Sequence, residues 1–381
     1  MNLRPLLTAL ALPVVFLLTA QTQMNAAQTA AVQATTMTAV EVLYSLGSGS
    51  QTTVTTYNVN PSTLAATKVG KTLTLAPPQS SAGVIPSPDD HFIYVLWYNS
   101  AYSTEYLDVY KTDAYGVPVT PRMQRMAIPL DTSLFIHPSG RFAYAQILTS
   151  SGSYVRLFQI NSTTGALSNP QTVATYGPGP YLLGFNSGGT KLYDVQMPTT
   201  YATYYYRTVN QTTGALGPET AFFSTQDLTV TLSNKYIAEL NDANENHSNM
   251  YIDVYANVVN PSQPLIHCTG TMLAACSSAT AAEFDRSGQY LLIRDGNLNT
   301  SQTEVARVNA ANQQLTATGA VIPGGTDVML SPDGKLAYEE ASNLSSVQVY
   351  RFYVGTGTIR AGSVVPAAGP YPGGFVPATR R

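Results

Sequence analysis

The sequence predicts an all-β protein, a seven-bladed β-propeller whose blades are four-stranded and antiparallel. Three observations predict this fold. A strand, turn and strand phrase recurs along the chain, a second strand pattern follows each copy, and the C-terminal segment supplies a strand that the first unit lacks. Units of four strands that repeat roughly every 40 to 50 residues are typical of propeller blades.

The recurring phrase consists of a tight polar turn followed by an apolar strand. Its copies begin at residues 87, 137, 186, 231, 285 and 331, so that successive copies start 45 to 54 residues apart: SPDDHFIY, HPSGRFAY, NSGGTKLY, TLSNKYIA, DRSGQYLL and SPDGKLAY. A short apolar run precedes each copy, which predicts a hairpin of two strands. His137 opens the second copy, so we expect it to shape a turn and not to act as a catalytic base.

A second pattern fills the outer half of each unit. Alternating apolar positions lead into an Asn, Thr and Gly turn and then into a further short strand. The segments begin at Thr55, Asp108, Arg156, Tyr206, Asp253 and Gln348. Each unit therefore contains four strands.

The two ends of the chain complete one blade together. The first unit, VEVLYSLGS followed by TTYNVNPS, lacks its innermost strand, and GPYPGGFVPA near the C-terminus resembles a first strand without a blade after it. We therefore predict a single propeller over residues 39–381, closed by the C-terminal strand. A two-sheet sandwich would not need the C-terminus to complete the first unit.

The N-terminus predicts export. One Arg precedes an apolar run from about Leu6 to Leu18, which is short for a membrane span and suits a signal peptide over residues 1–27. Ala20 and Ala27 are the expected cleavage points, and residues 28–38 read as a linker. We expect a secreted or periplasmic protein with no membrane span after the signal is removed.

The composition excludes nucleic acid as a partner. Charged residues make up 11% of the chain, against roughly 25% in ordinary domains, and the net charge is -3. No block of Lys and Arg supplies the electrostatic footprint that nucleic-acid binding needs.

The only two cysteines, Cys268 and Cys276, lie eight positions apart. In an oxidising compartment they can close a small disulfide loop, and two buried free thiols are the alternative. His267 offers no second pair of spaced ligands, so we expect no metal site here. The loop from Asn241 to Asn249 has calcium-like alternate spacing but lacks the required glycine and bidentate glutamate, so we expect a solvated loop.

The repeat resembles the lactonase-type seven-bladed propellers. SPDGKLAY from Ser331 and STTGALS from Ser162 carry the likeness, which covers nearly the whole chain after the signal. These motifs are repeat features, so they imply the fold and not a reaction. The family includes bacterial phosphogluconolactonase, fungal carboxymuconate cyclase and YVTN-repeat surface proteins.

The resemblance implies a site where first strands start and second strands end. Lactonase-like members carry a histidine at a first-strand start, and no blade of this chain has one; Tyr181 stands nearest to that position. At a second-strand end, Asn241 and Asp242 match the family's Asn-Glu, or Glu239 does after a two-residue shift. A carboxylate there could activate water, with Arg294 as the nearby cation. The alternative is that Asn241 and Asp242 open a polar loop.

Further ligand-binding candidates lie on the same face. Asp227 and Asp327 occupy one first-strand position in two blades, where they can bind a ligand or cap the backbone. Trp97 can supply a stacking surface for a sugar or peptide, or can simply pack.

Together these observations predict an exported lactonase-like propeller that binds a small molecule, a glycan or a cell-envelope protein, with catalysis lost or altered. The alternative is a lactone hydrolase that uses a carboxylate-activated water. We expect a monomer without a cofactor.

Overall fold

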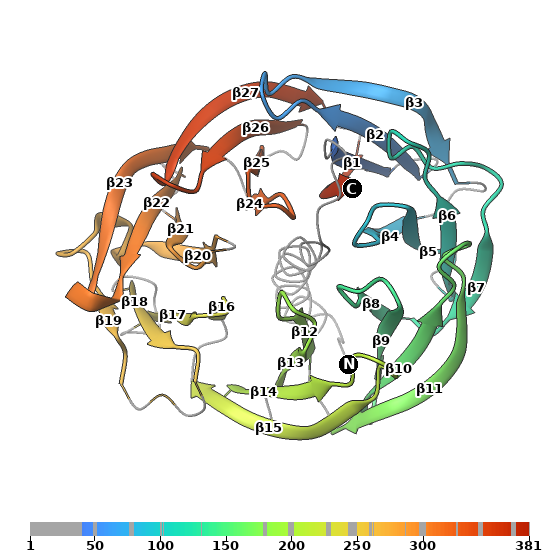
Figure 1. Cartoon of the computed structure of the whole chain (residues 1–381), viewed down its shortest axis with the longest axis horizontal. Helices are drawn as coiled ribbons and strands as arrows, with labels where there is room; N and C mark the ends of the chain where they lie inside the picture. The colour runs from blue at the N-terminus through green and yellow to red at the C-terminus, as the bar shows by residue number, and fades with distance from the viewer. Residues whose placement is uncertain are drawn as a thin grey trace, which may run out of the picture.

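The computed structural model describes residues 40–48, 52–75, 80–99, 101, 103–130, 132–177, 181–196, 202–225, 230–242, 250–258, 261, 263–285, 287–296, 302–324, 327–341, 346–366 and 371–380. These residues form seven four-stranded sheets around a central axis (Figure 1). The strands pair antiparallel throughout the described sheets. The prediction of an all-β, seven-bladed propeller is confirmed.

Each blade takes its strands from one stretch of chain, except the first. Blade 1 contains β28 (Tyr371–Arg380), β1 (Val40–Ser48), β2 (Thr53–Val59) and β3 (Ala66–Thr74). Blade 2 contains β4 (Ser80–Pro86), β5 (Phe92–Tyr98), β6 (Glu105–Lys111) and β7 (Gln124–Ile128). Blade 3 contains β8 (Thr132–Ile136), β9 (Phe142–Thr149), β10 (Gly152–Ile160) and β11 (Leu167–Tyr176). Blade 4 contains β12 (Tyr181–Phe185), β13 (Lys191–Gln196), β14 (Ala202–Val209) and β15 (Leu216–Thr225).

The remaining three blades follow the same order from the axis outward. Blade 5 contains β16 (Val230–Leu232), β17 (Tyr236–Asp242), β18 (Met250–Ala256) and β19 (Ile266–Cys268). Blade 6 contains β20 (Ala279–Phe284), β21 (Tyr290–Asp295), β22 (Gln302–Asn309) and β23 (Gln314–Pro323). Blade 7 contains β24 (Asp327–Leu330), β25 (Leu336–Glu340), β26 (Ser346–Tyr353) and β27 (Thr358–Pro366). Two short 3-10 helices, η1 (Ala274–Ser277) and η2 (Ala310–Asn312), complete the described elements.

The C-terminal strand closes the ring, as the sequence predicts. β28 pairs antiparallel with β1 from Val40 opposite Arg380 to Ser48 opposite Tyr371. β1 pairs on its other side with β2, so both of its edges are satisfied. β28 therefore supplies the innermost strand of blade 1, and closure leaves no long unpaired edge between the two chain ends.

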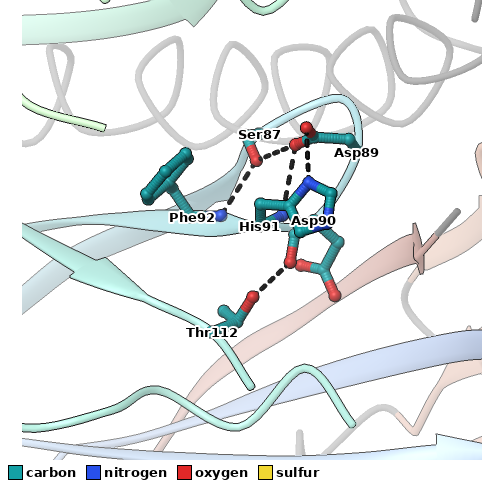
Figure 2. Close-up of polar contacts among 6 residues, drawn as sticks. All are labelled: Ser87, Asp89, Asp90, His91, Phe92 and Thr112. Atoms are coloured by element: carbon teal, nitrogen blue, oxygen red, sulfur yellow. Dashed lines mark hydrogen bonds and ion pairs between the residues drawn. The ribbon is translucent and has the colours of Figure 1, made fainter. Parts of the chain in front are cut away.

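The turns between first and second strands lie on one face of the ring, which we call the turn face. Figure 2 shows the turn of blade 2, where the Ser87 hydroxyl donates to Asp89 at 2.7 Å and accepts from the backbone N–H of Phe92 at 3.0 Å. The His91 ring also contacts Asp89, at 2.6 Å. Ser87 and His91 both bind Asp89 and not each other, so the trio fixes the turn and does not form a nucleophile and base pair.

His137 occupies the corresponding turn of blade 3. Its Nδ1 contacts the Ser139 hydroxyl at 2.7 Å and its Nε2 contacts the carbonyl of Gly189, in blade 4, at 2.8 Å. Burial lowers the pKa of His137, so the neutral ring is favoured. A side chain at Gly189 would collide with the imidazole, because an added Cβ would lie 2.5 Å from Nε2. His137 therefore joins two blades on the turn face.

The core lies between neighbouring blades, where tyrosines of second strands reach the next blade. The hydroxyls of Tyr44, Tyr94 and Tyr144 donate to the carbonyls of Gly116, Gly165 and Gly214 respectively. Each glycine has a positive φ in the turn between third and fourth strands, which a side chain rarely tolerates. These contacts repeat the same joint around the ring.

The joint between blade 7 and blade 1 departs from this pattern. Leu64, with a φ of 63°, replaces the turn glycine. Its carbonyl accepts from the backbone N–H and the hydroxyl of Ser363, at 3.1 and 2.7 Å. The corresponding tyrosine, Tyr338, is fully buried, and its hydroxyl has no hydrogen-bond partner among the described residues. The joint beside the ring closure is thus packed but lacks the tyrosine hydrogen bond.

Candidate functional site

The face opposite the turn face, which we call the mouth face, carries the starts of first strands and the ends of second strands. β17 ends there in blade 5 and carries Glu239, Asn241 and Asp242. Asp242 is the last residue of that strand, opposite Met250. Asp327 begins β24, and Asp227 lies outside the described residues.

Glu239 is held inside the joint between blades 4 and 5. Its side chain is 5% exposed. The hydroxyl of Thr225, the last residue of β15 in blade 4, donates to one carboxylate oxygen, and Tyr255 donates to the other at 3.1 Å. Both oxygens accept hydrogen bonds, and burial raises the pKa of Tyr255 further above its ordinary value. Glu239 therefore faces blade 4 as an acceptor.

Asn241 lies two residues further along β17, so it lies on the same side of the sheet as Glu239. The residue is 8% exposed, and its Nδ2 has no hydrogen-bond partner among the described residues. A buried amide donor without a partner is costly, and a ligand acceptor that reached it would recover that cost.

The contacts of Glu239 continue outward across the blade. Tyr255 also lies 3.5 Å from a carboxylate oxygen of Asp253, and the other oxygen of Asp253 contacts His267 at 2.7 Å. Glu239, Asp253 and His267 are register partners on β17, β18 and β19, which places them in one row. The sequence did not predict this row, because it depends on the register of three strands. The alternation of Asp253 and Tyr255, which places both side chains on one side of β18, was the signal available in the sequence.

Arg294 lies on the other side of its own sheet, away from Glu239. It belongs to β21 of blade 6 and lines a small cavity together with Glu283 and with Val328, which belongs to blade 7. Glu239 instead faces the joint between blades 4 and 5, whereas Arg294 faces the joint between blades 6 and 7. The structure therefore does not bring this carboxylate and this guanidinium to one point.

The two remaining candidates lie in different blades. Tyr181 begins β12 and packs, half-buried, against the same aromatic cluster as Tyr255, the residue that donates to Glu239. Trp97 is 3% exposed and stacks on Tyr106 with ring centroids 4.4 Å apart. Its burial leaves little of the ring for a ligand at the mouth face.

Cys268 and Cys276 form a disulfide with a Cα separation of 6.0 Å, at the outer side of blade 5. Within the described ranges, no group of three His, Cys, Asp or Glu side chains could hold a metal ion. The same residues include no helix long and apolar enough to cross a membrane.

Comparison with solved structures places this ring of blades among known propellers. A candidate 6-phosphogluconolactonase from Bacteroides uniformis superposes with a TM-score of 0.58 and 16% identity, over 89% of this chain and 99% of its own. A candidate 6-phosphogluconolactonase from Bacteroides fragilis superposes with a TM-score of 0.59 and 15% identity, over 90% of this chain and 99% of its own. The fold is that of the lactonase-type propellers.

A protein from Lactobacillus plantarum has the same fold, with a TM-score of 0.59 and 14% identity over 90% of this chain and 99% of its own. No protein-family model matches the sequence, and no curated protein matches it. At this level of identity the lactonase-type fold is shared, whereas the site must be argued from the residues of this chain.

Proposed function

We propose that the protein is an exported propeller that binds a polar small molecule or a glycan at the mouth face of blades 4 and 5, without hydrolysing a lactone. The observation that carries this proposal is the state of Glu239, whose two carboxylate oxygens accept from Thr225 and Tyr255. A carboxylate that activates water must direct a lone pair at that water. Both oxygens of Glu239 already accept from the protein, which turns the group toward Thr225 and Tyr255 and leaves fewer lone pairs for a catalytic water.

The position of Arg294, the cation that the sequence suggested, supports the same proposal. Attack of water on a lactone carbonyl develops negative charge on the carbonyl oxygen, which needs a donor or cation within about 3 Å. Arg294 faces the joint between blades 6 and 7, so it does not supply that charge beside Glu239. Among the described residues the Asn241 amide has no acceptor, which suits recognition of a hydroxyl or carbonyl oxygen of a ligand.

Lactone hydrolysis is the second candidate, because the structural neighbours from both Bacteroides species are candidate 6-phosphogluconolactonases. In that function Glu239 would release the Thr225 or the Tyr255 hydroxyl and then take a proton from water. Export away from the cytoplasm, proposed from residues 1–27, separates this protein from sugar phosphates and favours the binding function.

Turnover against a panel of sugar and aromatic lactones distinguishes the two functions. Glu339 is the matched control, since it occupies the same repeat position in blade 7 and is also buried. We expect the wild type to leave every lactone unhydrolysed above the background rate. Hydrolysis that disappears in Glu239→Gln and persists in Glu339→Gln would overturn the binding proposal.

Binding is tested directly with the same protein. Saturation-transfer NMR against a glycan and sugar-acid panel should detect a ligand whose signal falls in Asn241→Ala and persists in Glu339→Gln. N-terminal sequencing of the protein from culture fractions tests export, with a new N-terminus after Ala20 or Ala27 expected. An intact N-terminus on cytoplasmic protein would contradict export.

A further inference from the structure

A second candidate site lies at the outer edge of the ring, between blades 1 and 2. A cavity of about 270 Å³ is bounded by β3 on one side and by Tyr110 and the segment before β7 on the other. β3 and β7 are the outermost strands of their sheets, as Figure 1 shows. Pockets for drug-sized ligands start at about 300 Å³, so this cavity suits a smaller molecule. We call it the rim groove.

One guanidinium of the rim groove is fixed rigidly. Arg125 donates to both oxygens of Asp108, at 2.7 and 2.6 Å, and Asp108 is fully buried. The guanidinium also lies over the Trp97 ring, 4.6 Å from its centroid. A bidentate ion pair combined with a cation–π contact holds the Arg125 side chain in one position.

The second guanidinium belongs to Arg122 and is held loosely. Its Nε lies 3.7 Å from Asp108, and its side chain is 42% exposed. Asp108 is already bound bidentately by Arg125, so the ion pair with Arg122 is long and weak. Two positive charges therefore share one negative charge, which leaves a net charge of about +1 at the groove.

The walls of the rim groove are mixed in character. Thr74 and Thr120 line it with hydroxyl groups, and Leu73 and Leu75 also line it but are only 6% and 2% exposed. The Tyr110 hydroxyl lies 3.4 Å from Asp108, and burial together with that carboxylate raises the pKa of Tyr110 to about 12.

We propose that the rim groove binds a small organic monocarboxylate, with Arg122 as the residue that pairs with the carboxylate. The planar fork of a guanidinium matches a carboxylate with two parallel hydrogen bonds. A single negative charge balances the net charge of about +1 at the groove. A phosphate dianion carries more charge than the groove balances.

The test is an NMR titration of the purified protein with benzoate as the probe. Methyl benzoate is the uncharged control, and inorganic phosphate tests the other anion class. Arg122→Gln removes the proposed partner from an exposed position, so folding should be preserved. Arg307→Gln, an exposed arginine on β22 of blade 6, is the matched control variant.

We expect saturable binding of benzoate that weakens about tenfold or more in Arg122→Gln, because a charge-assisted pair contributes at least that factor. Arg307→Gln should bind as the wild type does, methyl benzoate should bind more weakly, and added salt should weaken benzoate binding. The proposal is overturned by equal affinity of Arg122→Gln and wild type, by equal affinity for the ester, or by tighter binding of phosphate. The absence of any benzoate binding would also overturn it.

Discussion

The hydroxyl groups of Tyr144 and Tyr338 should contribute differently to stability, although both tyrosines occupy the same repeat position. Tyr144 is buried and donates to the Gly214 carbonyl of the next blade at 2.6 Å. Tyr338 is equally buried, but its hydroxyl lacks a partner among the residues described, since the carbonyl of Leu64 accepts from Ser363. Replacement by Phe removes only the hydroxyl in each case.

The expected magnitudes follow from hydrogen-bond energetics. Tyr144→Phe loses one buried hydrogen bond and leaves the Gly214 carbonyl without its donor, which should lower the free energy of unfolding by about 1 to 2 kcal/mol. Tyr338→Phe removes a hydroxyl that is buried away from water and forms no hydrogen bond with the described residues. It should leave the free energy of unfolding unchanged or raise it by about 1 kcal/mol.

Equilibrium unfolding in urea measures both variants against the wild type, with the disulfide kept oxidised. Unchanged m-values would show that only the native state is affected, so the midpoints can be compared directly. A loss of stability in Tyr338→Phe as large as that in Tyr144→Phe would refute the reasoning. It would mean that the Tyr338 hydroxyl has a partner in solution.

Three further predictions concern buried titratable groups and the disulfide. His137→Ala should destabilise the fold by about 1 to 3 kcal/mol, because the ring contacts Gly189 of the next blade. Burial lowers the pKa of His137, so the stability from the neutral ring is present above pH about 6.5 and lost as pH falls below it; urea midpoints across pH should show this loss in the wild type and not in the variant. Burial raises the pKa of Asp194 from 3.8 to about 7. The unfolded chain therefore releases this proton before the folded protein does, and the free energy of unfolding falls as pH rises from about 3.8 to about 7. Asp194→Asn should therefore gain stability relative to the wild type at about pH 8 and not at about pH 4, and equal differences at both would contradict the assignment. Replacing Cys268 and Cys276 together by Ser should cost about 2 to 3 kcal/mol by the same urea assay, the value expected for closing a loop of this length, and an unchanged midpoint would show that the loop is held without the bond.

The repeat made the fold predictable, because the phrase that fixes each hairpin recurs with its turn chemistry intact. Ser87 and Ser331 both bind an aspartate two residues on and a backbone N–H five residues on, as their shared phrase predicts. The missing first strand of blade 1 predicted the pairing of β28 with β1. Such contacts are local or follow from counting strands.

The candidate site was less predictable, because the side of a blade that a residue faces changes with a one-residue shift in register. Glu239 immediately follows the repeat position of Tyr144 and faces the preceding blade. Arg294 comes one position later in its own blade and faces the following one. Both residues lie near second-strand ends, as predicted. The difference of one repeat position directs Glu239 to the preceding blade and Arg294 to the following blade. The sequence pattern alone does not state which blade each side chain meets.

The closure of the ring by β28 also dictates the order of events during synthesis. β1 is among the earliest strands to be made, and its inner edge stays unpaired until the final strand emerges and binds it. Contacts between such distant segments slow folding, and an exposed edge during that interval can pair with another chain. Translation that terminated shortly before β28 would therefore release a chain with six complete blades and one open edge, which could bind a chaperone or aggregate.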